Sequence, residues 1–177
     1  FYKVYTPFWK AVRGREPDAP ERAPSRIPEP ETWPASDALA DWRLGARMDR
    51  GAAVVARHAA PGEDAARRRL DAFVAGRIGD YKAARDRVDL DATSHLSEHF
   101  ATGELSPRTA WFAAAEAAEG EGGDGALGFL QELVWREFAY HLLYHTPKLE
   151  SENWREEWDA FPWRGDNDDA ERWRRGL

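Results

Sequence analysis

The apolar residues that follow residue 61 recur at the spacing of helices that bury one face. In a predicted helix over 62–78, three consecutive arginines at 67–69 fall mostly outside the apolar stripe. The stripe itself consists of Leu70, Phe73, Val74 and Ile78. Neither a period-two strand pattern nor an internal repeat is found, so the pattern predicts an all-α region.

Capping signals divide the rest of this region into further helices. A short helical segment is expected at 81–87, and the next helix begins among the hydroxyl residues of 91–100 and stops at Thr102-Gly103. Ser106 followed by Pro107 predicts a helix that runs to about Ala118, since serine caps and proline suits the first turn. After a glycine-rich turn at 120–125, a last helix is expected from about Ala126 to His145.

The first 60 residues have a different composition. They contain seven prolines scattered among Arg, Glu, Ala and Ser. Repeated proline removes backbone donors and fixes φ, so this stretch is predicted to be an extended connector between domains with few regular elements. A short helical turn is expected within 35–44, where Ser36 or Asp37 stands near its start.

Composition narrows the class of protein. The chain has 177 residues, enough for one domain or one domain plus an extended segment, and it contains nine tryptophans and no cysteine. The absence of cysteine excludes disulfides and thiolate chemistry and indicates an intracellular, cytoplasmic setting. A net charge of −7 argues against a uniformly basic nucleic-acid-coating protein, although a local basic groove is compatible with it. No apolar run is long enough for a membrane span, so no membrane partner is expected.

A row of functional side chains stands on the last predicted helix. Glu132, Trp135 and Arg136 occupy positions i, i+3 and i+4, and Phe129 lies one turn earlier, so all four project to the same side. One interpretation is structural: Glu and Arg four residues apart form a favourable helix pair, and the Trp belongs to the core. The other interpretation is a binding wall.

Two more patterns have competing interpretations. The run Thr93-Ser94-His95-Leu96-Ser97 places hydroxyl donors at a helix start, which suits a phosphate, but it also describes an ordinary N-cap. The His pairs 95/99 and 141/145 have the spacing of metal ligands, yet neither has the Glu of the metalloprotease motif nor an evident third ligand. No metal site is therefore predicted.

Five motifs in a fixed order resemble the photolyase/cryptochrome family over nearly the whole chain. The order is Val4-Tyr-Thr-Pro-Phe-Trp9, Tyr81 with Arg85, Thr93-Ser-His-Leu-Ser97, Thr102-Gly-Glu-Leu-Ser-Pro-Arg108 and Glu132-Leu-Val-Trp-Arg-Glu-Phe138. Within the family the chain is most similar to a class I photolyase acting on cyclobutane pyrimidine dimers. The resemblance implies an interdomain linker at 1–60 and the first half of the helical FAD-binding domain at 61–177.

The resemblance also implies roles for single residues. The flavin site takes Tyr81, the loop 93–97 (Thr93, Ser94, His95, Leu96 and Ser97), Phe129 and Arg136, where Phe129 replaces a Trp common in relatives. Glu132 and Trp135 face a dimer flipped from the duplex, and Arg85 contacts DNA through a phosphate. Trp163 matches the outermost indole of the chain that photoreduces the flavin, while aromatic packing is expected for Trp154, Trp158 and Trp173.

The implied reaction is light-driven electron transfer from reduced FAD to the dimer. An amino-terminal α/β domain with an antenna chromophore of the folate or deazaflavin type, and the later flavin-binding helices, are expected outside this chain, so the 177 residues alone are not expected to hold FAD tightly. The complete protein is expected to be monomeric. A cryptochrome-like FAD photoreceptor without repair activity and a noncatalytic helical module are the alternatives.

Overall fold

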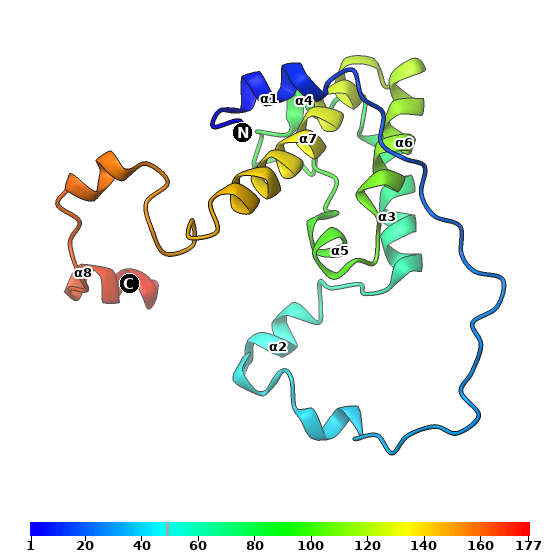
Figure 1. Ribbon diagram of the computed structural model, residues 1–177, viewed down its shortest axis with the longest axis horizontal. Coiled ribbons are helices and arrows are strands. Elements are labelled where there is room, and N and C mark those ends of the chain that lie inside the picture. The colour runs from blue at the N-terminus through cyan, green and yellow to red at the C-terminus, as the bar shows by residue number, and fades with distance from the viewer. Residues whose placement is uncertain (49) are drawn as a thin grey trace. The chain divides into compact units, whose positions relative to one another are not determined.

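Helices form where the sequence supplies an apolar stripe or a strong cap, and they are the only regular elements among residues 1–48 and 50–177, which the computed structural model describes (Figure 1). The α-helices are α1 (Tyr5–Val12), α2 (Arg50–Val55), α3 (Glu63–Gly76), α4 (Tyr81–Ala84), α5 (Ser97–Thr102), α6 (Pro107–Glu119), α7 (Gly123–His145) and α8 (Asp168–Arg174). Three 3-10 helices are η1 (Leu39–Trp42), η2 (Ala46–Met48) and η3 (Glu156–Ala160). The all-α prediction is confirmed.

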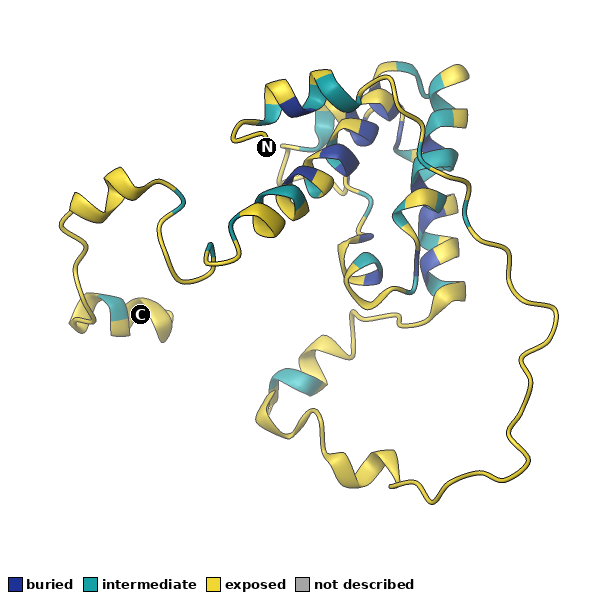
Figure 2. Cartoon of the chain, in the orientation of Figure 1, coloured by how far each residue is buried: buried dark blue, intermediate teal, exposed yellow. Residues whose placement is uncertain are grey.

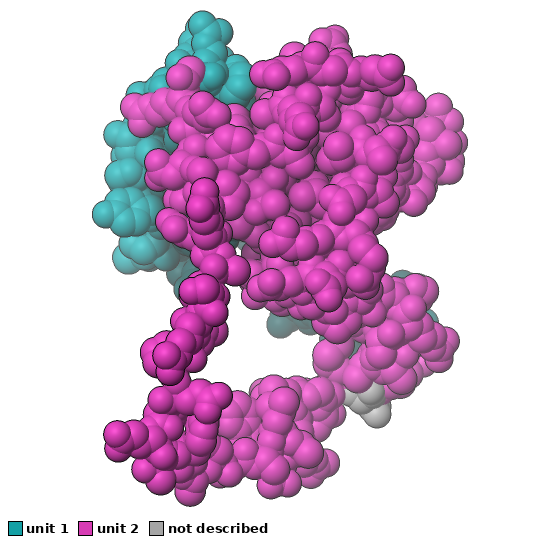
Figure 3. All heavy atoms as spheres, turned by 90° about the vertical axis from the view of Figure 1, so that its right-hand side faces the viewer, with its two compact units in different colours: residues 1–13, 135–177 teal, residues 14–134 magenta. Residues whose placement is uncertain are grey.

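The chain divides into two compact units. Unit 1 contains residues 1–13 and 135–177, and unit 2 contains residues 14–134 (Figure 3). The division falls within α7, after Val134, so that this helix contributes residues to both units.

The core of unit 2 lies among α3, α6 and the first half of α7, where Figure 2 shows the buried residues concentrated on the inner faces of the helices. Ala66 of α3 and Ala110 and Ala114 of α6 are fully buried, and their small side chains allow these two helices to pack closely. Larger side chains fill the remaining space: Leu70, Phe73, Ile78, Tyr81, Leu96, Leu105, Phe129, Leu130 and Leu133. The apolar stripe predicted for the first long helix is therefore buried, apart from Val74, which is half-buried.

Glycines on α7 set how closely the segment before α4 approaches. A Cβ atom at Gly125 would collide with the carbonyl oxygens of Ile78 and Gly79, and one at Gly128 would lie 3.2 Å from the Cβ of Lys82. Only glycine allows this backbone approach. The contact holds α4 against α7 one turn before the functional row on that helix.

Unit 1 is held by aromatic contacts between α1 and the second half of α7. Phe8 is buried, and its ring lies 5.3 Å from Phe138 and 5.2 Å from His141, measured between centroids. The backbone N–H of Tyr2 donates to Nε2 of His141 at 2.9 Å. The apolar residues of the first motif thus form a helix that packs against α7, and not an extended connector.

The helix boundaries follow the predicted caps closely in unit 2. Ser106 accepts a hydrogen bond from the backbone N–H of Arg108 at 3.2 Å, with Pro107 in the first turn, as predicted. Gly103 adopts the left-handed conformation after α5. The last long helix begins at Gly123, three residues before the predicted start. Gly123 and Gly125 therefore belong to the helix and not to the turn before it.

The prediction of few regular elements in 1–60 is correct for residues 15–38 and wrong for α1 and α2. The prolines keep residues 15–38 irregular and largely exposed. In contrast, α1 forms because Phe8 gives it a buried apolar anchor, and Pro7 lies in the first turn, where proline is tolerated. The 3-10 helix η1 falls inside the helical turn expected at 35–44.

Replacing Gly125 by Ala tests the close approach between α7 and the backbone of 78–79. The added methyl collides with main-chain carbonyl oxygens, which cannot rotate away as a side chain would, so we expect the free energy of unfolding to fall by about 1–3 kcal/mol. Urea denaturation measures it. The matched control is Gly76→Ala in α3, where a Cβ meets nothing within 4 Å and helix propensity favours alanine. Equal stability of the Gly125→Ala variant and the wild type would show that the backbones can separate at no cost.

Candidate functional site

Tyr81, Arg85 and Glu132 form a connected polar cluster in unit 2. Tyr81 begins α4 with a buried side chain that meets Phe129 edge-on, with ring centroids 5.4 Å apart and planes at 89°. One turn later, Arg85 forms an ion pair with Glu132 of α7. Both charged side chains are 35% exposed, so the pair lies at the surface of the core rather than within it.

Burial and charge shift the ionisation of this cluster. Burial raises the pKa of the Tyr81 phenol, the Glu132 carboxylate raises it further, and a hydrogen bond from Arg85 opposes both. The hydrogen bond to Glu132 raises the pKa of Arg85. Both shifts reinforce the ordinary protonation states at physiological pH, which are a neutral phenol and a cationic guanidinium beside Glu132.

The row on α7 has partners that the sequence alone did not identify. Glu132 pairs with Arg85, and Arg136 pairs instead with Glu137 at 2.8 Å, donates to the Tyr140 hydroxyl at 3.1 Å and stacks over the Tyr140 ring. The i, i+4 spacing of Glu132 and Arg136 indicated a pair within one helix. No sequence signal identified the actual partner of Glu132, because Arg85, the C-cap of α4, is distant from Glu132 in the sequence.

The loop before α5 is held by two arginines, Arg69 within α3 and Arg77 at its end. Arg77 lies 2.7 Å from a carboxylate oxygen of Asp91, whose other oxygen meets the imidazole of His95. Arg69 donates to the backbone carbonyl of His95 at 2.8 Å and forms an ion pair with Glu98. His95 itself has a φ of 53°, in the left-handed region, so the loop turns sharply between its two hydroxyl-bearing ends.

The hydroxyls of this loop do not cap the helix. The residue that precedes α5 is Leu96, without a capping side chain, and the ordinary N-cap interpretation of Thr93, Ser94 and Ser97 is wrong in this structure. Leu96 is fully buried and fixes the loop to the core, while Thr93 and Ser97 are exposed and Ser94 is half-buried. Leu96 therefore anchors the loop in the core, and the loop exposes its hydroxyl donors at the surface.

His99 is a buried polar group immediately after this loop. Its side chain is almost fully buried, and Nδ1 lies 2.6 Å from Oε2 of Glu104, a hydrogen bond that lowers the pKa of Glu104. Nε2 lies 3.7 Å from Oε1 of Glu98 and has no hydrogen-bond partner among the described residues. Sequence reasoning gave no role to Arg69, Arg77 or Glu104.

The histidine pairs are engaged in other contacts. His95 and His99 each meet a carboxylate, and His141 and His145 pack edge-on with centroids 4.6 Å apart. Across residues 1–48 and 50–177, no three His, Cys, Asp or Glu side chains gather as a metal site.

Trp135 is the exposed member of the row. The residue is 44% exposed, and its indole lies flat against the ring of Tyr5 from α1, a contact within unit 1 that sequence reasoning missed. Phe138 meets the same indole edge-on. A partly exposed indole with a fixed orientation offers a flat apolar surface to a ligand.

The tryptophans between residues 154 and 173 differ in how far they are exposed. Trp163 is 63% exposed and donates from Nε1 to the carbonyl of Trp158 at 3.1 Å. Trp173 is 80% exposed, so the aromatic packing expected for it is not observed. Trp158 contacts only Phe161 among the aromatic rings of the described residues, with centroids 6.0 Å apart, and Trp154 is half-buried beside Phe1.

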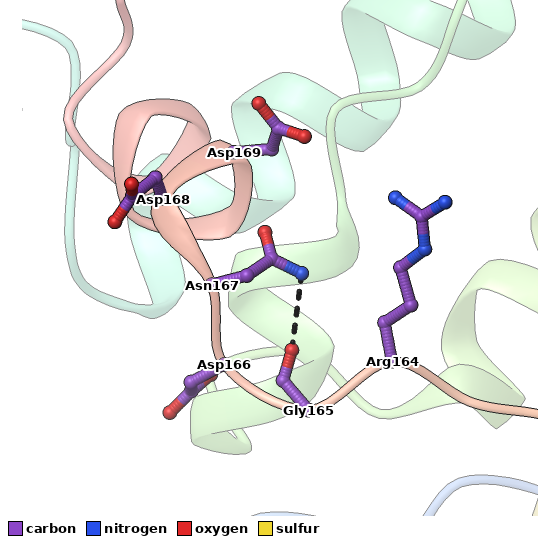
Figure 4. A pocket seen from close by; sticks show the side chains of 6 residues that line it. All are labelled: Arg164, Gly165, Asp166, Asn167, Asp168 and Asp169. Atoms are coloured by element: carbon purple, nitrogen blue, oxygen red, sulfur yellow. Dashed lines mark hydrogen bonds between the residues drawn. The ribbon is translucent and has the colours of Figure 1, made fainter.

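A shallow hollow lies where the chain enters α8, a segment without a predicted role (Figure 4). Asn167 caps α8 by accepting from the backbone N–H of Ala170 at 3.0 Å, and it donates to the carbonyl of Gly165 at 3.1 Å. The lining of the hollow comprises Arg164, Gly165, Asp166, Asn167, Asp168 and Asp169. The acidic first turn of α8 accounts for this composition.

The described helices were compared with the length and apolar character of a membrane-spanning helix. Within residues 1–48 and 50–177, none of them combines the length and the apolar character that crossing a bilayer requires.

Comparison with known proteins places these features in a family context. Residues 129–177 match the family described as the FAD binding domain of DNA photolyase. The deoxyribodipyrimidine photo-lyase of Agrobacterium fabrum is 40% identical over 177 residues, covering 99% of this chain and 37% of the relative. A deoxyribodipyrimidine photo-lyase of Thermus thermophilus is 38% identical over 175 residues, with the same coverage. The chain thus spans about 37% of the length of these relatives.

A solved structure agrees with the sequence comparison. The crystal structure of a bacterial class III photolyase from Agrobacterium tumefaciens matches with a TM-score of 0.86 and 39% identity, covering 99% of this chain and 37% of that one. The resemblance to the photolyase/cryptochrome family and the helical fold that it implied are confirmed. The narrower assignment to class I stays a prediction, since the matching structure is titled class III.

The bond between His99 and Glu104 predicts a pH-dependent stability. The pKa of Glu104 is lowered on folding, so its contribution is present above its ordinary value of about 4.3 and is lost as the pH falls through the folded value. We expect Glu104→Gln to lower the free energy of unfolding at pH 7 and the difference from wild type to shrink between about pH 5 and pH 3. Urea titrations at several pH values measure it.

Glu116→Gln, at an exposed position on α6, is the control and should leave the profile unchanged. A Glu104→Gln deficit that persists unchanged at low pH would mean that the side chain stabilises by packing and not by its charge.

Proposed function

We propose, from this resemblance, that the chain is the interdomain linker and first half of the FAD-binding domain of a DNA photolyase that repairs cyclobutane pyrimidine dimers in light. The observation that carries the proposal is the Glu132 carboxylate of α7, held by Arg85. Trp135, three positions later in the sequence, is an exposed aromatic residue. A flat surface and a polar arm are what recognition of an extruded base needs.

The loop at 91–97 has donor chemistry that fits the phosphates of FAD. Thr93 and Ser97 offer exposed hydroxyls, which donate to phosphate oxygens. The nearby carboxylates would repel an anion, but Asp91 is paired with Arg77, and Glu98 with Arg69. The cations thus offset the local negative charge, and the loop is able to accept an anionic group.

The aromatic and charged side chains around α7 suit the rest of the flavin. Phe129 and Tyr81 form a neutral aromatic wall, since a tyrosine phenol is protonated at neutral pH and burial raises its pKa further. The resemblance adds Arg136 as a cation. When bound, reduced FAD would supply the light-driven one-electron chemistry, while the protein supplies placement and electrostatics.

Each residue of the row then has a defined task toward DNA. Trp135 stacks against the flipped dimer, and Glu132 accepts hydrogen bonds from its polar edge. Arg85 holds the Glu132 carboxylate in one orientation, and since a guanidinium has five N–H donors, donors remain for a DNA phosphate. Arg85 therefore links recognition of the backbone to recognition of the lesion.

Other parts of the proposal concern the complete protein. Trp163, with most of its indole exposed, is suited to exchange electrons with an external reductant as the outermost member of a photoreduction chain. A folate or deazaflavin antenna in an amino-terminal α/β domain, a monomeric state and a cytoplasmic location complete the assignment.

The decisive test uses the complete protein with the change Glu132→Ala. We expect light-dependent repair of a dimer-containing oligonucleotide to fall about 10- to 100-fold, because hydrogen bonds to charged groups are worth about 1.5–3 kcal/mol. Flavin content, measured by visible absorbance, should not change. Repair is followed by the loss of dimers under blue light against a dark sample.

The control Glu116→Ala, on the exposed face of α6, should repair at the wild-type rate. Unchanged repair by Glu132→Ala would remove Glu132 from the site. A wild-type protein that binds FAD yet leaves dimers intact in light would replace the photolyase assignment with the cryptochrome-like photoreceptor.

A further inference from the structure

The orientation of Trp135 is set by a residue that no part of the proposed mechanism uses. The phenol ring of Tyr5 lies parallel to the indole, with centroids 3.6 Å apart and planes at 8°. Tyr5 belongs to α1, near the start of the sequence and far from Trp135 along the chain, and both residues lie within unit 1. The stack therefore brings the first motif of the sequence to the proposed lesion-binding indole.

The parallel arrangement depends on the surrounding side chains. Two aromatic rings ordinarily prefer an offset or edge-to-face geometry, so a stacked pair needs external support. Phe138 supplies it by meeting Tyr5 edge-on at 5.8 Å and 72°, and Trp135 at 5.7 Å and 75°. Phe138 is itself buried and also packs on Phe8 and His141, so its own ring is held in place.

Helix α1 is held at the same place by Phe8. Phe8 lies three residues after Tyr5, on the same side of the short helix, and packs on Phe138 with centroids 5.3 Å apart. Phe138 thus contacts Tyr5, Phe8 and Trp135. The position of Tyr5 follows from the packing of α1 and does not depend on a ligand.

Tyr5 covers one face of the indole but leaves much of it accessible. Trp135 is 44% exposed although one face is stacked and one edge meets Phe138. With one face stacked and one edge covered, the face opposite Tyr5 and the remaining edges are what is left to account for this exposure. A ring fixed in this way has already lost its rotamer freedom before a ligand arrives, which lowers the entropic cost of binding.

We propose that Tyr5 is a positioning residue, which backs the Trp135 indole so that its opposite face is presented, already oriented, to the extruded pyrimidine dimer. This inference rests on the proposed function. It assigns to the linker segment a part in lesion recognition, since α1 supplies the support for a residue of α7.

The test measures binding in the dark by the complete, flavin-loaded protein. Fluorescence anisotropy gives the Kd for an oligonucleotide with one thymine dimer and for the same oligonucleotide without damage. We expect Tyr5→Ala to weaken binding of the damaged strand about 2- to 10-fold, which is the value of one aromatic pair, and to leave the undamaged strand unaffected. Tyr5→Phe keeps the stack and should bind like the wild type.

A second readout separates positioning from chemistry. At saturating protein, when every damaged strand is bound, repair per absorbed photon by Tyr5→Ala should stay within about twofold of wild type, because the free-energy loss falls on binding. Tyr144→Ala is the matched control: Tyr144 is an aromatic residue of the same unit that is 83% exposed and lies against His145. It should leave the Kd for damaged DNA unchanged.

Tyr5→Leu guards against a folding defect, because leucine keeps apolar contact with Phe138 but has no flat face. A weakened Kd in Tyr5→Leu with wild-type thermal stability and flavin content supports the inference. Wild-type affinity of Tyr5→Ala or Tyr5→Leu for damaged DNA overturns it, and so does tighter binding, which would mean that Tyr5 occupies the face used by the base. If the wild type fails to prefer damaged DNA, the proposed function itself fails.

Discussion

The arrangement of unit 2 depends on one close contact between main chains, where the carbonyls of Ile78 and Gly79 lie against Gly125 of α7. A side chain there would force α4 away from α7. Without that contact the aromatic wall of Tyr81 and Phe129 would open, and Arg85 would not reach Glu132. A residue with no side chain therefore sets the distance at which the functional side chains meet.

Arginine is the second organising element of this unit. Three guanidinium groups each bind a carboxylate: Arg69 binds Glu98, Arg77 binds Asp91, and Arg85 binds Glu132. Surface pairs of this kind add little stability, so their value lies in geometry. They orient acidic side chains on an acidic molecule and offset negative charge next to surfaces assigned to anionic ligands.

Local sequence signals predicted the parts of the fold that local physics determines. The Ser106 cap, the Gly103 stop and the stripe of the helix containing Leu70 and Phe73 were all recognisable, because each acts over one or two turns. Partners far apart in sequence were not: the motifs named the candidate residues but could not show that Tyr5 stacks on Trp135. Packing decided those contacts, and it also formed α1 in a stretch that the prolines marked as extended.

The left-handed backbone at His95 constrains which residues this position can accept. Its side chain is exposed, and such positions ordinarily tolerate most substitutions, yet a φ of 53° penalises any residue branched at Cβ. Selection at this site would therefore act on the shape of the main chain, and glycine and asparagine should be accepted more readily than valine or isoleucine. Natural sequences that replace the histidine at this position would still preserve the turn of the main chain.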